Sequence, residues 1–281
     1  MREFIEILKV IFLGIVEGIT EWLPISSTGH MILVDEFLKL NVSDEFKEMF
    51  FVVIQLGAIL AVPVIFWKKL FPFSRNNTKE ENNRIWHLLF KVAVGVFPAA
   101  VLGVLFDDLL DKYLYNFVVV AIALIVYGVA FILVEKLKKD KEYRVESVYD
   151  ITYKDALIIG AYQVLSLIPG TSRSGSTILG GMLTGVSRTA AAEFSFFLAI
   201  PVMLGASALK VLKFIFDGFT ATTFELALLA VGIVVSFLVS LAVIDFLMSF
   251  VKKHSFTAFG IYRIALGALV IVYFLIKLAV A

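Results

Sequence analysis

The chain has 281 residues, of which 60% are hydrophobic and 17% are charged, and this balance favours an integral membrane protein over a soluble one. Its formal net charge of +1 provides no field that would attract a nucleic acid, so no nucleic-acid partner is expected. The sequence contains no cysteine, which excludes disulfides, thiol catalysis and thiolate metal sites.

In chain order, the apolar segments form two series, each made of one interrupted region and three long runs. The interrupted regions are 4–40, broken by PISSTG, and 156–186, broken by PGTSRSGS. The long runs cover 49–67, 85–106, 115–134, 191–214, 224–250 and 256–278. Each run is close to the roughly 20 residues that cross a bilayer, and each interrupted region predicts a re-entrant helical hairpin. The sequence therefore predicts an all-α integral membrane protein with six spanning helices and two re-entrant hairpins.

The two series resemble each other. At a spacing of 146 residues, Gly14, Glu17, Ser26, Thr28 and Gly29 correspond to Gly160, Gln163, Ser172, Ser174 and Gly175. At a spacing of 137, Gly95 corresponds to Gly232. Three spans per series reverse the direction of the second series, so we predict an inverted-topology repeat. Repeat one is about 1–140 and repeat two about 150–281, within a single membrane domain.

The charges of the loops predict the orientation. Segments 68–84, 136–154 and 252–254 are rich in Lys and Arg and should face the cytoplasm. Both termini then lie on the outer face. Lys210 and Lys213 also fall at an outer end, against the trend.

The first break, EGITEWLPISSTGH, contains two carboxylates. Glu17 and Glu21 are four residues apart and share one face of a helix, where mutual repulsion favours a proton donor or a metal ligand. The alternative for both residues is a solvated edge of an interfacial helix.

Hydroxyl and imidazole groups follow the carboxylates. Ser26, Ser27 and Thr28 precede the next helix, where they can cap its start or, with its free N–H groups, bind an anion. Capping is the expectation for Ser26. His30 is a candidate catalyst beside these groups, although a lone histidine on an apolar helix is more often a core residue.

The second break, PGTSRSGST, offers glycines, hydroxyls and one arginine. Gly170 permits a tight turn and a close backbone approach. Arg173 presents a planar fork of N–H groups that suits the paired oxygens of a phosphate, whereas the alternative is an intramembrane salt bridge to Glu17, Glu21 or Glu193. The hydroxyls that precede or open the next helix are candidate anion ligands: Thr171, Ser172, Ser174 and Thr177.

Gln55 and Glu193 begin the runs after the two hairpins, at matching places. They are expected to support the hairpins through hydrogen bonds to freed backbone groups rather than to contact a substrate. If inverted symmetry brings the breaks together, one supplies acid, base and nucleophile and the other an oxyanion clamp. That division is typical of a phosphoryl-transfer site.

The two breaks resemble the signature regions of the undecaprenyl-diphosphate phosphatase family, the bacitracin-resistance type. Glu17 and Glu21 form its E-x-x-x-E element, and residues 169–177 match every fixed letter of P-G-x-S-R-S-x-x-T. The resemblance implies hydrolysis of a C55 polyprenyl diphosphate, which recycles the lipid carrier for cell-wall synthesis and confers resistance to bacitracin, a competitor for that substrate. It also implies an enzyme of the bacterial plasma membrane with a site open to the outer face, and a homodimer.

The resemblance assigns catalytic roles to Glu17, Glu21, Ser27, His30 and Arg173, and phosphate binding to Ser172, Ser174 and Thr177. The expected mechanism has Ser27 or His30 attack the terminal phosphorus while Glu21 and His30 manage protons. The sequence decides neither between these nucleophiles nor whether Glu17 and Glu21 bind Mg²⁺ or Ca²⁺. A secondary transporter or flippase for a polyprenyl phosphate or a small anion is the alternative function, since broken helices in inverted repeats are usual there.

Overall fold

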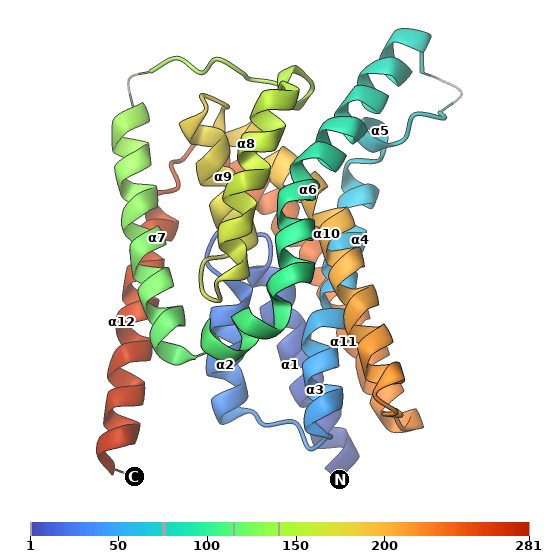
Figure 1. Cartoon of the computed structure of the whole chain (residues 1–281), viewed down its shortest axis with the longest axis vertical. Helices are drawn as coiled ribbons and strands as arrows, with labels where there is room; N and C mark the ends of the chain where they lie inside the picture. Colours follow the sequence, from blue (N-terminus) through green and yellow to red (C-terminus); the bar gives the residue numbers. More distant parts are fainter. Residues whose placement is uncertain (1, 75–76, 115, 140, 281) are drawn as a thin grey trace.

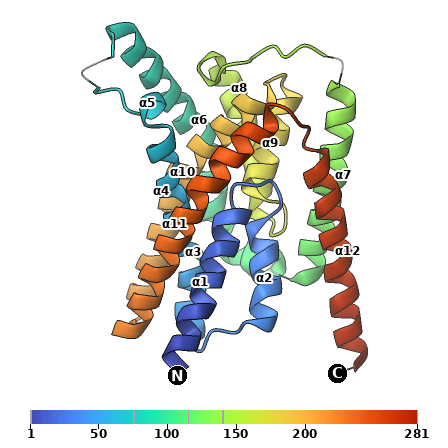
Figure 2. The same ribbon diagram turned by 180° about the vertical axis from the view of Figure 1, so that it is seen from behind.

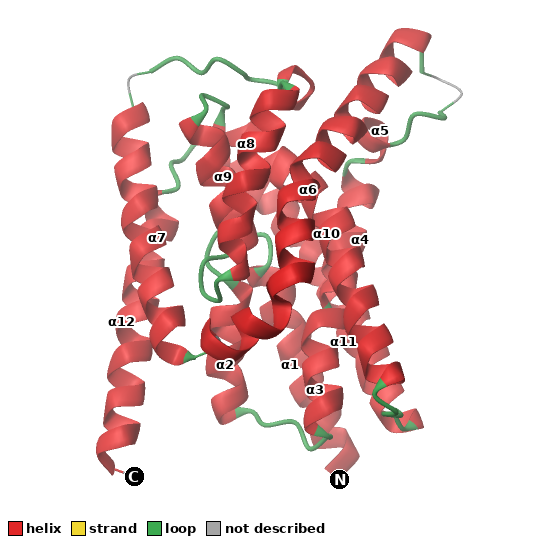
Figure 3. Ribbon diagram, viewed as in Figure 1, coloured by secondary structure: helices red, strands yellow, loops and turns green. Residues whose placement is uncertain are grey.

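The computed structural model describes residues 2–74, 77–114, 116–139 and 141–280. Most of these residues are helical, and the one strand-like bridge among them pairs Val145 with Val186 (Figure 3). Predictions that fall on residues 1, 75–76, 115, 140 and 281, including the start of a span at Tyr115, lie outside these ranges. For the described part of the chain, the all-α class is confirmed.

The helices follow one another as labelled in Figure 1. Their bounds are α1 Arg2–Thr20, α2 Ser27–Phe37, α3 Asp44–Val53, α4 Gln55–Ile65, α5 Trp67–Leu70, α6 Lys79–Leu114, α7 Phe117–Lys138, α8 Tyr153–Val164, α9 Arg173–Leu183, α10 Arg188–Phe216, α11 Thr223–Val251 and α12 Thr257–Val280. Several start at a hydroxyl that accepts a hydrogen bond from the third helical N–H, as Ser43, Thr152 and Thr222 do. Such caps satisfy donors that have no partner inside the helix, so local sequence sets these starts.

Six stretches of the described chain are long and apolar enough to cross a membrane. They are Asp44–Ile65, which joins α3 and α4, and Lys79–Phe106, Phe117–Lys138, Arg188–Phe216, Thr223–Val251 and Thr257–Ala279. Each overlaps one predicted run, and most extend beyond it because polar caps and charged turns continue the helix past the apolar residues. The six predicted spans are therefore confirmed, and the chain is a multi-pass membrane protein.

The two interrupted regions form the pairs α1–α2 and α8–α9. α2, α8 and α9 have only 11, 12 and 11 residues, whereas α1 has 19. Both breaks lie between the two ends of the bundle, at about mid-height in Figures 1 and 2. Short helices that end inside the bundle leave free N–H and C=O groups there, and these groups need partners from the protein.

Glycines set the closest helix crossings around these pairs. A Cβ at Gly160 of α8 would lie 2.2 Å from the carbonyl oxygen of Gly95 in α6. A Cβ at Gly14 of α1 would lie 3.1 Å from the carbonyl oxygen of Gly232 in α11. In a bilayer, such small residues let helix backbones approach and pack. As a result, α8 lies along α6, and α1 lies along α11.

The two ends of the bundle carry different segments. α1 begins and α12 ends at the lower end in Figure 1, together with the connections from α2 to α3 and from α10 to α11. The described parts of the Lys- and Arg-rich segments 68–84, 136–154 and 252–254 lie at the upper end (Figures 1 and 2). The basic segments therefore share one end of the molecule, opposite the starts and ends of the chain.

Candidate active site

The first break turns from α1 into α2 through a buried hydroxyl cap. Ser26 has φ 75°, and its Oγ accepts a hydrogen bond from Gly29 N at 3.2 Å. Positive φ is costly for a residue with a side chain, so the cap and the surrounding packing hold this turn. The expected capping role of Ser26 is confirmed. Trp22, in the same break, is fully buried, and its ring meets Phe196 of α10 edge-on with centroids 5.1 Å apart.

The second break turns from α8 into α9 in the same way. Ser172 has φ 72°, and its Oγ accepts from Gly175 N at 3.1 Å. Gly170 has φ 90°, and a Cβ there would lie 2.5 Å from the carbonyl oxygen of Val120 in α7. The tight turn and close approach predicted at Gly170 are therefore present. Both short helices start with their free N–H groups at a break, which is the arrangement that favours an anion.

The two breaks contact each other. Arg173 of the second break donates from Nη2 to Glu21 Oε1 of the first at 3.1 Å, and both side chains are buried. Ser174 Oγ donates to the backbone oxygen of Glu21 at 3.2 Å. Arg173 also donates from Nη1 to the backbone oxygen of Ser195 in α10 at 2.7 Å, and its guanidinium carbon lies 5.9 Å from the centre of the Trp22 ring. The salt-bridge alternative for Arg173 is therefore realised here, with Glu21 as the partner.

Glu21 also binds the first helix turn after its own break. Ser27 Oγ donates to Glu21 Oε2 at 2.7 Å. Each oxygen of this one carboxylate thus has a different partner, a hydroxyl on one side and a guanidinium on the other. A carboxylate in hydrogen-bond contact with a serine is placed to accept the proton of that serine as it becomes a nucleophile.

His30 has two hydrogen-bond partners among the described residues, and neither is Glu21. Its Nδ1 lies 2.7 Å from the backbone oxygen of Ser26, and its Nε2 lies 2.7 Å from the hydroxyl oxygen of Tyr262 in α12. Both ring nitrogens thus have other partners, and the side chain of this break that is hydrogen-bonded to Glu21 is Ser27. The expectation that Glu21 and His30 both manage protons stays a prediction, and any transfer between them is not through a direct hydrogen bond of this structure.

Glu17 lies one helical turn before Glu21 and is fully buried. Neither of its carboxylate oxygens has a hydrogen-bond partner within the described part of the chain. Glu17 lines a cavity of about 810 Å³, so the alternative of a solvated interfacial edge does not describe it. Thr28 and Gln55 line the same cavity. A buried carboxylate without a hydrogen-bond partner is costly, so Glu17 can be stabilised by a proton, a cation or a hydrogen-bond donor that enters the cavity.

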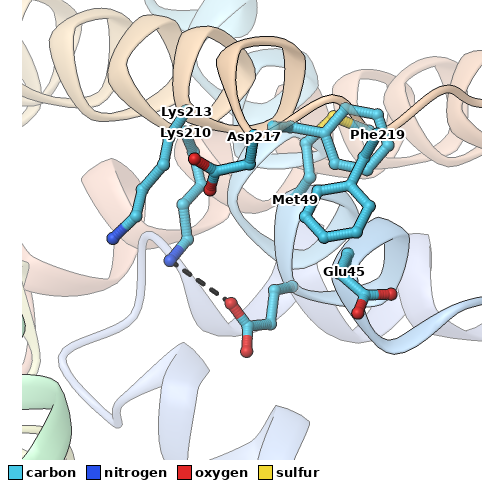
Figure 4. Close-up of a pocket in the computed structure, with 8 residues that line it drawn as sticks. Glu45, Met49, Lys210, Lys213, Asp217 and Phe219 are labelled. Carbon is cyan, nitrogen blue, oxygen red and sulfur yellow. Dashed lines mark ion pairs between the residues drawn. The ribbon is translucent and has the colours of Figure 1, made fainter.

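The cavity extends from Glu17 to charged residues of α2, α3 and α10, among them Asp35, Glu48 and Lys210. A smaller pocket of about 130 Å³ shares some of this lining, and Figure 4 shows it with the ion pair between Lys210 and Glu48 at 3.5 Å. Lys210, one of the two lysines that oppose the predicted charge pattern, thus forms an ion pair with a carboxylate. These elements place the mouth of the cavity at the end where α1 begins and α12 ends (Figure 1).

Of the two predicted supporting residues, Glu193 has a partner that differs from the prediction. Glu193 accepts hydrogen bonds from Lys69 Nζ of α5 at 2.8 and 2.7 Å, so its described partner is a lysine and not freed backbone of a hairpin. The repeat matched Glu193 with Gln55 and therefore gave no indication of Lys69, which lies in a different segment. Gln55 lines the cavity with Glu17, and its predicted supporting role stays a prediction.

The remaining hydroxyl candidates differ in whether they already have hydrogen-bond partners within the protein. Thr177 Oγ1 donates to Ser195 Oγ at 2.7 Å, so it supports α9 against α10. Ser172 is occupied as the helix cap. Thr171 Oγ1 is buried without a hydrogen-bond partner among the described residues, as is Arg173 Nε. Thr171 and Arg173 therefore retain donors for an added ligand.

No group of three or more His, Asp or Glu side chains that could hold a metal ion occurs within residues that the structure describes. Of the two carboxylates considered for a cation, Glu21 already binds Ser27 and Arg173. Glu17 alone keeps both oxygens unpartnered there.

Sequence reasoning missed two neighbouring residues of α12. Arg263 is fully buried and donates to the backbone oxygens of Pro24 at 3.1 Å, Gly170 at 2.8 Å and Thr171 at 2.9 Å, so it binds both breaks at once. Tyr262 binds His30, as described above. The signal for Arg263 was present, because it is an arginine within an otherwise apolar run, and such residues mark functional positions. Nothing local distinguished Tyr262 from an ordinary membrane tyrosine.

The chain is similar to known proteins over nearly its full length. The sequence profile of the family described as Bacitracin resistance protein BacA matches residues 10–269. An undecaprenyl-diphosphatase of Enterococcus faecalis is 62% identical over 271 residues, which is 96% of this chain and 97% of that relative. An undecaprenyl-diphosphatase of Acetivibrio thermocellus is 57% identical over 271 residues, which is 96% of this chain and 98% of that relative. The family match spans both breaks.

Proposed function

The chain belongs to the bacitracin resistance protein BacA family, and from this premise we propose that it hydrolyses undecaprenyl diphosphate to undecaprenyl phosphate and inorganic phosphate. The observation that carries the proposal is that one carboxylate, Glu21, contacts both Ser27 of the first break and Arg173 of the second. A hydroxyl, a proton acceptor and a cation within one contact set are the parts that phosphoryl transfer needs. The reaction recycles the lipid carrier for cell-wall synthesis and removes the diphosphate that bacitracin binds.

The first chemical step uses Ser27 as the nucleophile. Its Oγ attacks the terminal phosphorus, the bond from that phosphorus to the bridging oxygen breaks, and the serine proton passes to Glu21. Undecaprenyl phosphate leaves with the electron pair of the broken bond. Arg173 and the free N–H groups at the starts of α2 and α9 neutralise the charge that spreads over the phosphoryl oxygens.

The second step hydrolyses the phosphoserine. Water attacks the phosphorus, His30 takes a proton from that water, and Glu21 returns its proton to Ser27 as inorganic phosphate is released. The contacts favour Ser27 over His30 as the nucleophile, because both ring nitrogens of His30 have other partners whereas Ser27 Oγ lies on a carboxylate. A trapped phosphoenzyme tests the choice: phosphoserine survives acid, whereas an acid-labile phosphohistidine would reverse it.

Thr28, Thr171, Ser172, Ser174 and Thr177 remain proposed phosphate ligands, with Glu17 and Gln55 at the wall of the cavity. Substrate must displace part of the Glu21–Arg173 contact for the guanidinium to reach a phosphate. The buried Arg173 Nε and Thr171 Oγ1, which lack partners in the described part of the chain, support a site that completes its hydrogen bonds on the substrate. Full turnover after thorough chelation would count against an essential Mg²⁺ or Ca²⁺ at Glu17 and Glu21.

We also infer that α1–α2 and α8–α9 are re-entrant hairpins of an inverted repeat, with repeats of about 1–140 and 150–281 in one membrane domain. Two matched features support this. Ser26 and Ser172, 146 residues apart, are both helix caps with positive φ. The α1–α11 and α6–α8 crossings each place a hairpin glycine against a spanning-helix glycine. In each crossing the hairpin belongs to one repeat and the spanning helix to the other.

The orientation follows from charge. We propose that the protein lies in the bacterial plasma membrane with both termini and the mouth of the cavity on the outer face, because the Lys- and Arg-rich segments gather at the opposite end (Figure 1). Since the chain has no cysteine, a single cysteine introduced after α12 can be labelled alone. Labelling of intact cells by an impermeant maleimide is expected there, and labelling only after lysis would reverse the orientation. A homodimer and competition by bacitracin for the lipid diphosphate remain expectations.

The test of the activity is phosphate release from a C55 diphosphate by purified protein in detergent. Wild type is expected to release phosphate, and Arg173→Ala to lower kcat/KM by about 1,000-fold or more. Arg84→Ala is the control, because Arg84 is exposed on α6 and pairs with Glu80. Detergent leaves no compartments, so a transporter or flippase would release no phosphate. Inactive wild type together with lipid-coupled anion uptake in vesicles that Arg173→Ala alters would favour transport.

A further inference from the structure

The ring of His30 is held in one tautomer by its contacts. Nδ1 lies 2.7 Å from the backbone oxygen of Ser26, and a carbonyl oxygen can only accept a hydrogen bond. Nδ1 therefore carries the proton of the neutral ring, and Nε2 carries the lone pair. The nitrogen that can act as a base is Nε2.

The partner of this nitrogen is a hydroxyl from the opposite end of the chain. Tyr262 Oη lies 2.7 Å from Nε2, and the two rings stack with centroids 5.7 Å apart and an interplanar angle of 3°. Since Nε2 has no proton in the neutral ring, the tyrosine hydroxyl is the donor. Tyr262 thus fixes both the plane of the imidazole and the direction of its lone pair.

We propose that Tyr262 holds the ring of His30 and relays the proton of the attacking water to it, since the lone pair of Nε2 points at the tyrosine hydroxyl. The proposal rests on the proposed function, because it assumes that His30 takes the proton of the attacking water. A hydroxyl suits this task because it can donate its proton to Nε2 and accept the proton of a water through a lone pair. The step balances: the tyrosine proton passes to Nε2, the hydroxyl oxygen takes a proton from the water, and the remaining hydroxide attacks the phosphorus, so Tyr262 ends the step neutral.

The alternative is that Tyr262 is one of the tyrosines that lie at a membrane interface, with its hydroxyl in contact with His30 by proximity alone. The position in the chain argues against this reading. Tyr262 directly precedes Arg263, whose guanidinium binds the backbone oxygens of Pro24 and Gly170 in the two breaks. One turn of α12 therefore contacts the imidazole and both breaks together, which couples the ring to the geometry of the site.

The test compares two tyrosines that each contact a histidine. Tyr262→Phe keeps the stacked ring and removes the hydroxyl. Tyr153→Phe is the matched control, because Tyr153 Oη lies 3.0 Å from His87 Nδ1, away from both breaks. We expect Tyr262→Phe to lower kcat about tenfold with KM within about twofold of wild type, and Tyr153→Phe to change neither.

A double variant separates positioning from general structural damage. If Tyr262 acts through His30, then His30→Gln with Tyr262→Phe is no slower than His30→Gln alone. If the two losses multiply, Tyr262 acts independently of His30 and the proposal is wrong. Wild-type kcat in Tyr262→Phe would also overturn it. Wild type that releases no phosphate refutes the proposed function itself, and the role of Tyr262 with it.

Nitrogen-15 spectra of the purified protein provide a readout that does not depend on turnover. The chain has three histidines, so His30→Gln identifies the His30 signals. We expect His30 in the Nδ1–H form in wild type, and a shift of its Nε2 signal in Tyr262→Phe while the His87 signals stay in place. An Nε2–H form in wild type, or an unchanged Nε2 signal in Tyr262→Phe, would show that the hydroxyl does not hold the ring.

Discussion

Replacing Arg263 by methionine tests whether the last helix holds the two breaks together. The guanidinium is fully buried, and its three shortest hydrogen bonds reach the backbone oxygens of Pro24 at 3.1 Å, Gly170 at 2.8 Å and Thr171 at 2.9 Å. Methionine fills a comparable volume but donates nothing, so these buried carbonyls lose a partner. The first break and the second break then lose their shared donor.

The size of the effect follows from these bonds. Hydrogen bonds inside membrane proteins average about 0.6 kcal/mol, whereas bonds from a charged donor contribute about 1.5–3 kcal/mol. At about 1 kcal/mol each, the three bonds predict a loss of about 3 kcal/mol in the free energy of unfolding. A displacement of one break by about 1 Å also predicts a roughly 100-fold lower kcat/KM. Arg263→Lys keeps the charge without the planar fork, so an intermediate loss is expected.

Denaturant unfolding in detergent and phosphate release on the same samples measure both quantities. The control is Arg84→Met, because Arg84 is exposed and pairs with Glu80 at 3.0 Å. A change within about 0.5 kcal/mol is expected for that variant. If Arg263→Met kept the stability and the kcat/KM of wild type, the reasoning that its buried bonds join the breaks would be refuted.

Three further predictions concern single positions. Ser27→Ala should lower kcat at least about 1,000-fold while thermal stability changes by less than about 1 kcal/mol, and phosphate release near the wild-type rate would remove the serine from the nucleophile role. Gly170→Ala should cost about 2 kcal/mol in chemical denaturation, because φ is 90° and the new Cβ would lie 2.5 Å from a backbone oxygen of α7. Gly205→Ala is its control, since a Cβ at this helical glycine meets nothing within 4 Å; equal losses in the two variants would contradict the strain. Burial acts to raise the pKa of Asp155, but the hydrogen bonds from Arg144 and from its helix cap outweigh it and hold the pKa below its usual value. The carboxylate therefore stabilises the fold above pH about 4 and loses this effect as pH falls through its lowered pKa, so Asp155→Asn should be less stable than wild type at neutral pH and converge with it in acid, whereas a gap that does not change with pH would oppose this.

The sequence predicted the features that depend on a few adjacent residues or on the bilayer alone. A spanning helix needs a run of apolar side chains of fixed length, so the six spans could be found without knowing what packs beside them. The cap at Ser26 could be predicted because its hydroxyl lies three residues before the N–H from which it accepts, whereas Ser172, which caps α9 in the same way, was predicted only as an anion ligand. The polar composition of the two breaks likewise predicted where a site would form.

Only the tertiary structure decided how the polar groups pair. Glu21 meets Arg173 across 152 residues, Glu193 meets Lys69 instead of a hairpin, and His30 meets Tyr262 instead of Glu21. These partners come from helices whose crossing is set by close glycine contacts and side-chain packing, and no periodicity in one segment specifies which face of another it will meet. Local sequence thus determined where the membrane is crossed and where polarity is buried, while the packing of distant helices determined which buried group neutralises which.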